Sequence, residues 1–199
     1  RDNLPVIPET FTLIPRQDTE KLVELAVRLI PDNARIIDLC TGSGCVAIST
    51  LKNTENTTAL AIDISAAALE VARENSCRLG TEERLELIEA DALEYSTDEQ
   101  FDAILSNPPY IAENVYKGLQ KEIFFEPEIA FVGGDDGAKF YRELTRKYKS
   151  NLKNDGFIAY EIGYDQGDTL RKIAEENGMS CEIIKDLSGN DRVAVLKIK

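Results

Sequence analysis

Short apolar runs alternate with amphipathic stretches along the chain from Ala34 onward. Runs rich in β-branched and aliphatic residues predict strands at 35–40, 58–64, 84–90, 101–107 and 156–162. Apolar residues at helical spacing predict helices at 44–52, 65–80, 138–152 and 167–178, and an earlier one at 18–30. In the helix at 65–80, Ser65 is a suitable N-cap and Gly80 a suitable C-terminal stop.

The end of the chain predicts a hairpin. Apolar runs at 179–187 and 192–199 flank Ser188-Gly189-Asn190-Asp191, a group of residues typical of a turn. Strands that alternate with helices imply βαβ units and a parallel sheet. The pattern therefore predicts an α/β fold with a mostly parallel seven-stranded sheet, one antiparallel strand from the C-terminal hairpin, and helices on both faces. No linker divides the chain, so we expect one domain over 31–199, led into by an entry segment and helix over 1–30.

Charge and hydropathy limit the partners. The chain has 23 basic and 36 acidic residues, a net charge of −13, which argues against non-specific affinity for nucleic acid backbones. No apolar run approaches the roughly 20 residues that span a bilayer, and the N-terminus lacks the apolar core of a signal peptide. We expect a cytoplasmic monomer with no membrane partner and no stable nucleic-acid binding. The chain begins at Arg1 rather than Met, as a fragment or processed chain does.

Cysteine and histidine usage excludes several chemistries. The four cysteines, Cys40, Cys45, Cys77 and Cys181, lack C-x-x-C spacing, and we expect them to be reduced and buried. The chain contains no histidine, so no zinc site is predicted. The same absence excludes Ser-His-Asp and Cys-His catalysis.

A glycine-rich turn follows the first predicted strand. Gly42, Gly44 and Ala47 fit the G-x-G-x-x-A pattern of dinucleotide-binding proteins, so NAD is one candidate ligand. The pattern alone is weak, because any tight turn between a strand and a helix favours glycine. Asp38 at the tip of the strand changes the balance: its carboxylate repels a pyrophosphate and suits a ligand with an ammonium or sulfonium group.

Two further predicted strands end near aspartates. Asp63 lies about 20 residues beyond the glycine turn, where a carboxylate accepts hydrogen bonds from ribose hydroxyls. Asp91-Ala92 follows the third strand, where a carboxylate can meet the exocyclic amine of adenine. Ligands bind at the carboxyl ends of parallel strands, so we expect these residues in one site. Solvated strand ends are the alternative interpretation.

The fourth predicted strand ends in Ser106-Asn107-Pro108-Pro109-Tyr110. Two consecutive prolines remove two backbone donors and end the strand. The side-chain carbonyl of Asn107 and the backbone carbonyl of Pro108 can then accept both hydrogens of a substrate NH2 group. Tyr110 offers a flat wall for a planar amide or base. A rigid loop that only turns the chain is the alternative.

Together these residues predict methyl transfer from S-adenosylmethionine to a planar NH2 group, with S-adenosylhomocysteine as product. In-line transfer needs positioning rather than a strong base. An NAD-dependent oxidoreductase and a non-catalytic cofactor-binding protein are the competing hypotheses. Asp38 and the missing histidine argue against the first, and the intact segment from Asn107 to Tyr110 argues against the second.

Motifs over almost the whole chain resemble those of class I methyltransferases, which have a Rossmann-like fold, and within them the release-factor glutamine methyltransferases (HemK/PrmC type). The similar segments are LIPRQDTEKLV (13–23), IIDLCTGSGCVAI (36–48), AIDIS (61–65), SNPPYI (106–111), FEPEIAFVGGDDG (125–137), YEIG (160–163) and DLSGNDRV (186–193). The I-P-R-x-D-T-E segment, NPPYI and the Glu-Pro segment in this order are specific to the family. NPPY alone is also similar to motifs of adenine-N6 and guanine-N2 methyltransferases, so a nucleic-acid base or another protein amide is the alternative target.

The resemblance implies a substrate and a set of site residues. The substrate would be the glutamine of the Gly-Gly-Gln motif in class-1 peptide-chain release factors, which act in translation termination. The methyl group would go to the side-chain amide nitrogen (N5) of this glutamine. The implied catalytic residues are Asn107, Pro108, Pro109 and Tyr110. The implied cofactor-binding residues are Asp38, Thr41, Gly42, Ser43, Gly44, Asp63, Ile64, Asp91, Ala92 and Asn107. Pro15-Arg16 and Glu126-Pro127 would line the substrate site, although a surface ion pair is an equal alternative for Arg16 and Glu126.

The chain departs from the family pattern in three places. Cys40 and Gln17 stand where the family usually has glycine and proline. A side chain at Cys40 is expected to crowd the first turn slightly. The sequence from Arg1 onward does not include the helical N-terminal domain of the family, which helps to dock the release factor. We therefore expect residues 31–199, the methyltransferase domain, to bind cofactor and to engage the protein substrate weakly.

Overall fold

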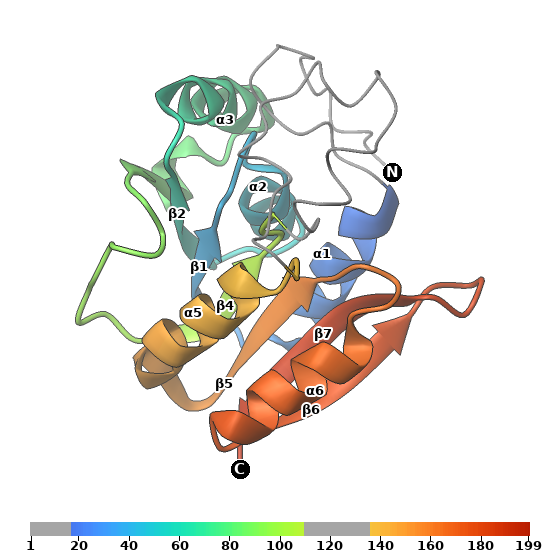
Figure 1. Ribbon diagram of the computed structural model, residues 1–199. Coiled ribbons are helices and arrows are strands. Elements are labelled where there is room, and N and C mark those ends of the chain that lie inside the picture. Colours follow the sequence, from blue (N-terminus) through green and yellow to red (C-terminus); the bar gives the residue numbers. More distant parts are fainter. Residues whose placement is uncertain (1–16, 110–135) are drawn as a thin grey trace.

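A seven-stranded sheet forms the centre of the computed structural model, which describes residues 17–109 and 136–199 (Figure 1). The strands are β1 (Arg35–Leu39), β2 (Thr58–Asp63), β3 (Leu85–Glu89), β4 (Phe101–Ser106), β5 (Leu152–Glu161), β6 (Met179–Lys185) and β7 (Asp191–Ile198). Their order is β3-β2-β1-β4-β5-β7-β6. The first five are parallel, and β7 is antiparallel to both β5 and β6. The predicted sheet, with one antiparallel strand, is confirmed.

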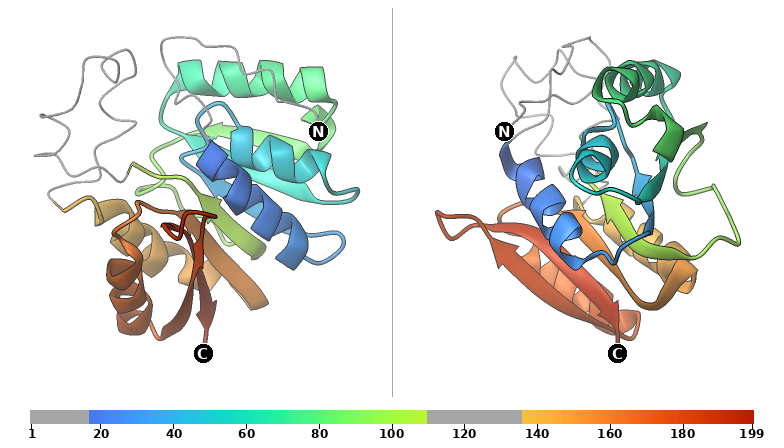
Figure 2. Two further views of the ribbon diagram at one scale, coloured as in Figure 1. Left: turned by 90° about the vertical axis from the view of Figure 1, so that its right-hand side faces the viewer. Right: turned by 180° about the vertical axis from the view of Figure 1, so that it is seen from behind.

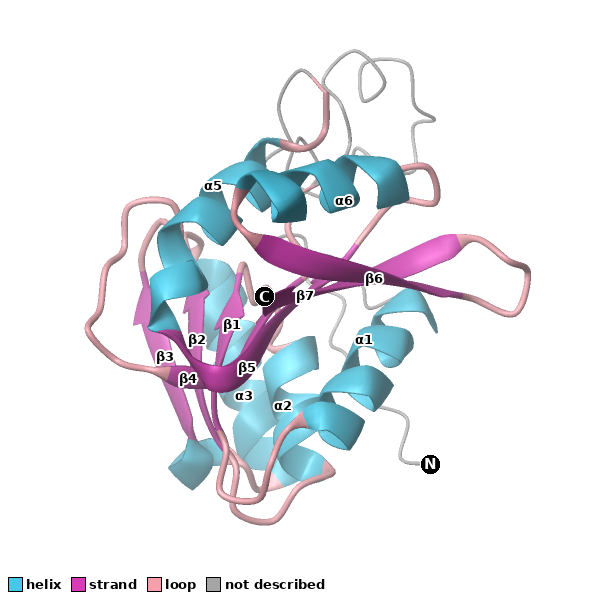
Figure 3. Cartoon of the chain, turned by 90° about the horizontal axis from the view of Figure 1, so that it is seen from below, coloured by secondary structure: helices cyan, strands magenta, loops and turns pink. Residues whose placement is uncertain are grey.

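Helices cover both faces of this sheet, as predicted. Helices α1 (Gln17–Leu29), α2 (Cys45–Lys52) and α3 (Ala66–Leu79) lie on one side, and α5 (Lys139–Tyr148) and α6 (Gly167–Glu176) lie on the other (Figure 2). Figure 3 shows the strands between these two groups of helices. We call the two sides of the sheet the α1–α2 face and the α5–α6 face.

The alternation of side chains along each strand produces two cores. On the α1–α2 face, strand residues pack with α1 and α2; they include Ile36, Ala61, Leu105, Ala159, Leu22, Ala26 and Leu51. On the α5–α6 face, the core includes Ile37, Leu60, Ile104, Ile158, Tyr141, Leu144 and Leu170. Central strands buried on both sides read as continuous apolar runs, which is why the sequence shows them clearly. Helix α1 contributes to the first core, and the expected division of the chain at residue 30 stays a prediction.

Most element ends follow local chemistry. The Ser65 side chain accepts a hydrogen bond from the backbone N–H of Ala68, 3.2 Å away, and Gly80 ends α3 in the left-handed conformation, as predicted. The predicted strand at 156–162 is longer in the structure, because β5 begins at Leu152. Residues 153–155 are polar and exposed and lie beside an irregularity in the β4–β5 pairing, so they carry no apolar signal. The helix predicted over 138–152 ends at Tyr148, and a 3-10 turn (Lys149–Asn151) follows it.

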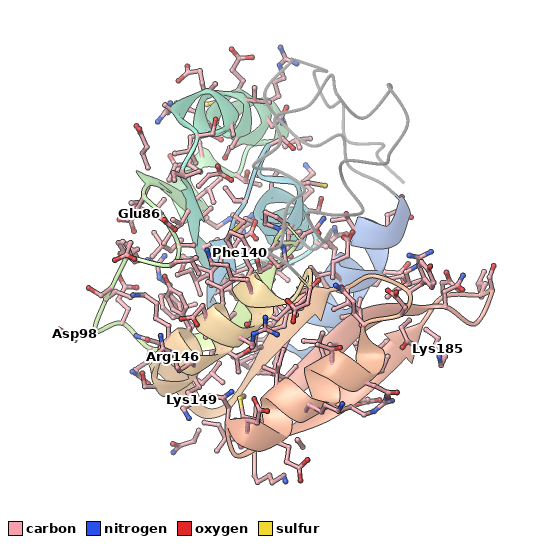
Figure 4. The ribbon with its side chains drawn as sticks, viewed as in Figure 1. Glu86, Asp98, Phe140, Arg146, Lys149 and Lys185 are labelled. Atoms are coloured by element: carbon pink, nitrogen blue, oxygen red, sulfur yellow. The ribbon has the colours of Figure 1, made fainter. Side chains whose placement is uncertain are left out.

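Charged side chains cover the outside of the molecule. Figure 4 labels examples on β3, the β3–β4 loop, α5 and the β6–β7 hairpin: Glu86, Asp98, Arg146 and Lys185, all exposed. All four cysteines are unpaired, as expected, but the expectation of burial is wrong: Cys77 is exposed on α3, and Cys40, Cys45 and Cys181 are only half-buried. No helix in the described part of the chain combines the length and apolar character needed to cross a membrane.

Candidate active site

Polar residues gather at the carboxyl edge of the sheet, where β1 has β2 on one side and β4 on the other. This reversal of strand order is the position at which open α/β sheets bind ligands. Asp38, Asp63 and Asn107 each follow by two residues a side chain in the α1–α2 core (Ile36, Ala61 and Leu105). Because side chains alternate along a strand, all three project on the α1–α2 face. The sheet therefore brings together three of the residues that the sequence singles out.

The glycine turn between β1 and α2 is held by backbone hydrogen bonds. The Thr41 N–H donates to Ile62 O (2.9 Å) and the Gly44 N–H to Thr41 O (3.0 Å). Gly44 has φ +80°, and a Cβ there would lie 2.6 Å from Ile48 Cδ1. Gly42 has φ +56°, and a Cβ there would meet none of the described residues within 4 Å. Gly42 thus borders space that no described residue fills, whereas a side chain at Gly44 would press on Ile48 and on Ala72 Cβ (3.1 Å).

Cys40 also has a positive φ, +60°. An L-residue in this conformation is strained by roughly 1–2 kcal/mol, which accounts for a preference for glycine at this position. The expected cost of Cys40 therefore arises from its backbone conformation rather than from crowding. The half-buried side chain packs against the α5–α6 core.

Asp38 is a buried carboxylate with one satisfied oxygen. Asp38 is 1% exposed, and its Oδ2 accepts hydrogen bonds from Thr41 Oγ1 (2.6 Å) and the Ala47 N–H (3.1 Å). Oδ1 has no hydrogen-bond partner among the described residues. Burial raises the pKa of Asp38 to about 7, and the nearby charge of Asp63 adds to this shift. The site therefore favours a cation or a hydrogen-bond donor opposite Oδ1.

Asp63 supports the glycine turn. Its Oδ2 accepts from the Gly42 N–H (2.8 Å) and its Oδ1 from the Ser65 N–H (2.9 Å). Burial raises the pKa of this carboxyl group, and the backbone donors oppose the shift. Each carboxylate oxygen keeps a second lone pair for a further donor. The adjacent Ile64 is 49% exposed, an apolar surface beside the carboxylate.

Asp91 and Ala92 lie beyond the third strand rather than at its tip, because β3 ends at Glu89. Asp91 Oδ1 accepts from the Leu93 N–H (2.8 Å) and closes a local turn. Ala92 is buried, and its carbonyl accepts a hydrogen bond from Tyr148 Oη (2.8 Å). The two residues thus form an ordered turn next to the end of β2.

Asn107 follows the last residue of β4, Ser106, whose hydroxyl donates to Leu39 O (2.5 Å). The side-chain oxygen of Asn107 is buried and has no hydrogen-bond partner among the described residues. Pro108 and Pro109 are buried and have no N–H to offer it. An acceptor held in this way is available for an N–H donor from a ligand.

Five predicted site residues lie outside the described residues: Pro15, Arg16, Tyr110, Glu126 and Pro127. In contrast, three polar residues at the edge were not singled out from the sequence. Glu161 ends β5, is 2% exposed, and accepts a hydrogen bond from Thr19 Oγ1 on α1 (2.7 Å). Asn75 on α3 donates to Ser43 O (3.1 Å) and braces the glycine turn. The sequence did contain a sign of Glu161: a carboxylate in the otherwise apolar run of β5 indicates a buried polar residue.

Comparison with known proteins agrees with this geometry. The family model of the methyltransferase small domain matches residues 19–128. The release factor glutamine methyltransferase of Clostridium acetobutylicum is 41% identical over 193 residues, which cover 94% of this chain and 68% of that protein. The enzyme of the same description from Neisseria gonorrhoeae is 42% identical over 189 residues, 93% of this chain and 68% of its own length. The chain thus spans about two thirds of these relatives.

Solved structures of methyltransferases share the fold. A ribosomal protein L11 methylase from Lactobacillus delbrueckii superposes with a TM-score of 0.68 at 23% identity, covering 92% of this chain and 80% of that one. A precorrin-6y C5,15-methyltransferase from Geobacter metallireducens superposes with a TM-score of 0.67 at 16% identity, covering 94% and 90%. The predicted class I methyltransferase fold is confirmed. From its fold and its relatives, the chain belongs to the release factor glutamine methyltransferases.

Proposed function

We propose that the chain transfers a methyl group from S-adenosylmethionine to the side-chain amide nitrogen of the Gly-Gly-Gln glutamine of class-1 release factors. The observation that carries the proposal is a pair of buried side-chain oxygens, Asp38 Oδ1 and Asn107 Oδ1, without partners among the described residues. They come from neighbouring strands and project on the same face. One oxygen suits a cation and the other an amide N–H, which are the groups that the two reactants bring.

The residues fit S-adenosylmethionine better than NAD. A buried carboxylate at Asp38 favours the ammonium or sulfonium of the first and repels the pyrophosphate of the second. Open space at Gly42 leaves room for the methionine part along Thr41–Gly44. Asp63 would accept hydrogen bonds from the ribose, and Ile64 with Asp91-Ala92 would border the adenine. Each carboxylate oxygen of Asp63 accepts one backbone N–H and keeps a lone pair for a second donor. The carboxylate can therefore bind both the turn and the ribose.

On the acceptor side, Asn107 and the Pro108 carbonyl would hold the two hydrogens of the glutamine amide. Tyr110 would pack on the amide plane, and Arg16 and Glu126-Pro127 would line the approach. Burial of Pro108 and Pro109 fixes the acceptors before the substrate arrives. Such pre-positioning is worth about 7–11 kcal/mol of the barrier in well-oriented reactions.

S-adenosylmethionine, when bound, supplies an electrophilic methyl group, so that an N–C bond forms while the C–S bond breaks and its electron pair stays on sulfur. The carbonyls of Asn107 and Pro108 then face a nitrogen that gains positive charge, and their dipoles stabilise it. The nitrogen loses its proton to water after the transfer. No residue has to act as a strong base, which suits a chain without histidine.

The direct test uses labelled S-adenosylmethionine, a purified class-1 release factor and peptide mapping by mass spectrometry. Duplex DNA is the parallel substrate, and a release factor with the Gly-Gly-Gln glutamine changed to glutamate is the control. We expect label on that glutamine alone. Label on DNA, or on another residue of the release factor, would replace the proposed substrate with the alternative one. The proposal also places the protein in the cytoplasm, where translation terminates. We propose that it acts there as a monomer.

A further inference from the structure

Glu161 is a buried carboxylate that the proposed chemistry has not used. It is the last residue of β5, next to β4 in the sheet, and Ser106 pairs with Tyr160. Asn107 and Glu161 are therefore the next residues along two paired parallel strands. Adjacent strands lie about 4.8 Å apart, and paired residues project on the same side. Glu161 thus follows the α1–α2 core residue Ala159 just as Asn107 follows Leu105.

The backbone at Glu161 is held firmly in place. Its carbonyl accepts a hydrogen bond from Tyr141 Oη (3.0 Å), and the N–H of the next residue, Ile162, donates to Arg192 O (2.9 Å). The Gly163 N–H donates to the side chain of Gln166 (2.9 Å). These bonds come from α5, β7 and the start of α6, so the end of β5 is fixed from several sides.

The side chain is held by a residue from a distant part of the sequence. Thr19, on the first turns of α1, donates to Glu161 Oε2 at 2.7 Å, and both residues are buried. Cys45, at the start of α2, is close enough to be affected by this carboxylate. The pKa of its thiol is raised to about 12, chiefly by burial, and the nearby carboxylates of Asp38 and Glu161 add to the shift. Because Glu161 follows the α1–α2 core residue Ala159 by two positions and is bonded to Thr19 on α1, its carboxylate lies on the α1–α2 side of the sheet.

We infer that Glu161, oriented by Thr19, is a positioning residue that places a fixed negative charge beside Asn107 and favours the cationic amide nitrogen formed during methyl transfer. The inference rests on the proposed function. A carboxylate close to a developing positive charge stabilises the transition state more than the neutral ground state. An unlike charge on the strand next to Asn107, in a partly desolvated site, is expected to change the rate by more than tenfold.

The decisive variant is Glu161→Gln, which keeps the size of the side chain and an oxygen that can accept from Thr19 but removes the charge. We expect kcat to fall at least tenfold, with the affinity for S-adenosylhomocysteine within twofold of wild type. Glu182→Gln, which removes one exposed charge from β6, is the matched control and should have no effect. Thr19→Val should lower kcat less than Glu161→Gln does. Thr19→Ser keeps the hydroxyl group and should have wild-type activity.

A second readout does not depend on turnover. Sinefungin carries an ammonium group in place of the methylsulfonium, whereas S-adenosylhomocysteine is neutral at that position. Calorimetry should show that Glu161→Gln lowers the preference for sinefungin over S-adenosylhomocysteine at least fivefold. If Glu161→Gln does not fold, the Thr19→Val and Thr19→Ser pair provides the same comparison.

The outcomes separate the two proposals. Wild-type kcat and wild-type sinefungin preference in Glu161→Gln would overturn the role of Glu161 and leave the proposed function intact. An unmodified release factor in the wild-type reaction, at a concentration high enough to offset weak docking and with the cofactor bound, would overturn the proposed function. In that case a reduced sinefungin preference would still support the charge at the transfer position, and an unchanged preference would reject it.

Discussion

The two faces of the sheet treat their buried polar atoms differently. On the α5–α6 face, Tyr148 Oη donates to Ala92 O (2.8 Å), Tyr160 Oη lies 3.0 Å from Thr145 Oγ1, and Tyr141 Oη donates to Glu161 O (3.0 Å). At the carboxyl edge on the opposite side, one side-chain oxygen each (Oδ1) of Asp38, Asn75 and Asn107 has no partner among the described residues.

The polar atoms with partners stabilise the fold, whereas the oxygens without partners are available to a ligand. A buried polar atom without a partner costs about 1–3 kcal/mol, and a ligand that supplies the missing donor recovers that energy. The contrast extends to neighbours in sequence, since Tyr160 points to the α5–α6 core and Glu161 to the other side. We therefore expect removal of these oxygens without partners at the α1–α2 edge to alter binding or transfer with little loss of stability. Changes on the α5–α6 face should lower stability and leave the reaction intact.

The largest effect is expected from Asn107→Ala. Loss of the oriented acceptor should lower kcat by about 10²–10³-fold, the range found when one preorganised group at a reaction centre is removed. Removal of a buried oxygen that has no partner among the described residues should leave the free energy of unfolding unchanged or higher. Calorimetry should give an affinity for S-adenosylmethionine within a few-fold of wild type. Asn56→Ala, at an exposed loop position, is the control, and equal loss of cofactor affinity and transfer would contradict the division of roles.

Asp38→Asn should weaken cofactor binding at least tenfold and stabilise the protein without ligand. Burial raises the pKa of Asp38 from 3.8 to about 7, so removal of the charge is worth up to about 4 kcal/mol at pH 8. Denaturant unfolding measures the gain in stability, and calorimetry measures the loss of affinity. A variant that binds cofactor normally would show that Asp38 does not face the ligand.

The same carboxyl group predicts a pH dependence. Between about pH 4 and 7 the folded protein holds a proton that the unfolded chain has lost, so the stability of the wild type relative to Asp38→Asn should fall as pH rises through this range. Affinity for S-adenosylmethionine, which favours the ionised form, should increase up to about pH 7 and then level off. A flat difference in stability from pH 5 to 8 would contradict the raised pKa.

The two glycines of the turn provide a sharper comparison within the α1–α2 edge. Gly44→Ala adds strain at φ +80° and a contact of 2.6 Å with Ile48, so it should destabilise the protein by at least about 2 kcal/mol. Gly42→Ala adds a methyl group in open space, so it should cost only about 1 kcal/mol of stability and chiefly weaken cofactor binding. Thermal unfolding with and without S-adenosylhomocysteine measures both effects. Equal losses of stability in the two variants would reject the distinction.

Tyr160→Phe on the α5–α6 face should give the smallest change. It removes the hydrogen bond with Thr145, so the free energy of unfolding should fall by about 1 kcal/mol. The value of kcat should stay within twofold of wild type. A large loss of kcat in this variant would show that the two faces are not functionally separate.

The sequence predicts the parts of the molecule whose signal is local. The apolar run of β1, the Ser65 cap, the Gly80 stop and the hairpin turn after β6 all depend on residues close in sequence. Asp38 and Asn107 also follow local signals, since a carboxylate and a Pro-Pro turn end strands that are otherwise apolar.

The features that sequence reasoning missed depend on contacts between distant residues. Thr19 and Glu161 are 142 positions apart, and only the packing of α1 on the end of β5 brings them together. The start of β5 at Leu152 is set by pairing with Phe101 rather than by the polar residues 153–155. The roles of Tyr110, Arg16, Glu126 and Pro127 stay predictions.

The most direct test of the account is a crystal structure of the chain with S-adenosylhomocysteine and a Gly-Gly-Gln peptide. We predict that the glutamine amide nitrogen lies about 3 Å from Asn107 Oδ1 and that a donor of the cofactor product lies at the same distance from Asp38 Oδ1. Ligands bound elsewhere, with both oxygens still lacking a partner, would contradict the central claim that these unsatisfied atoms mark the active site.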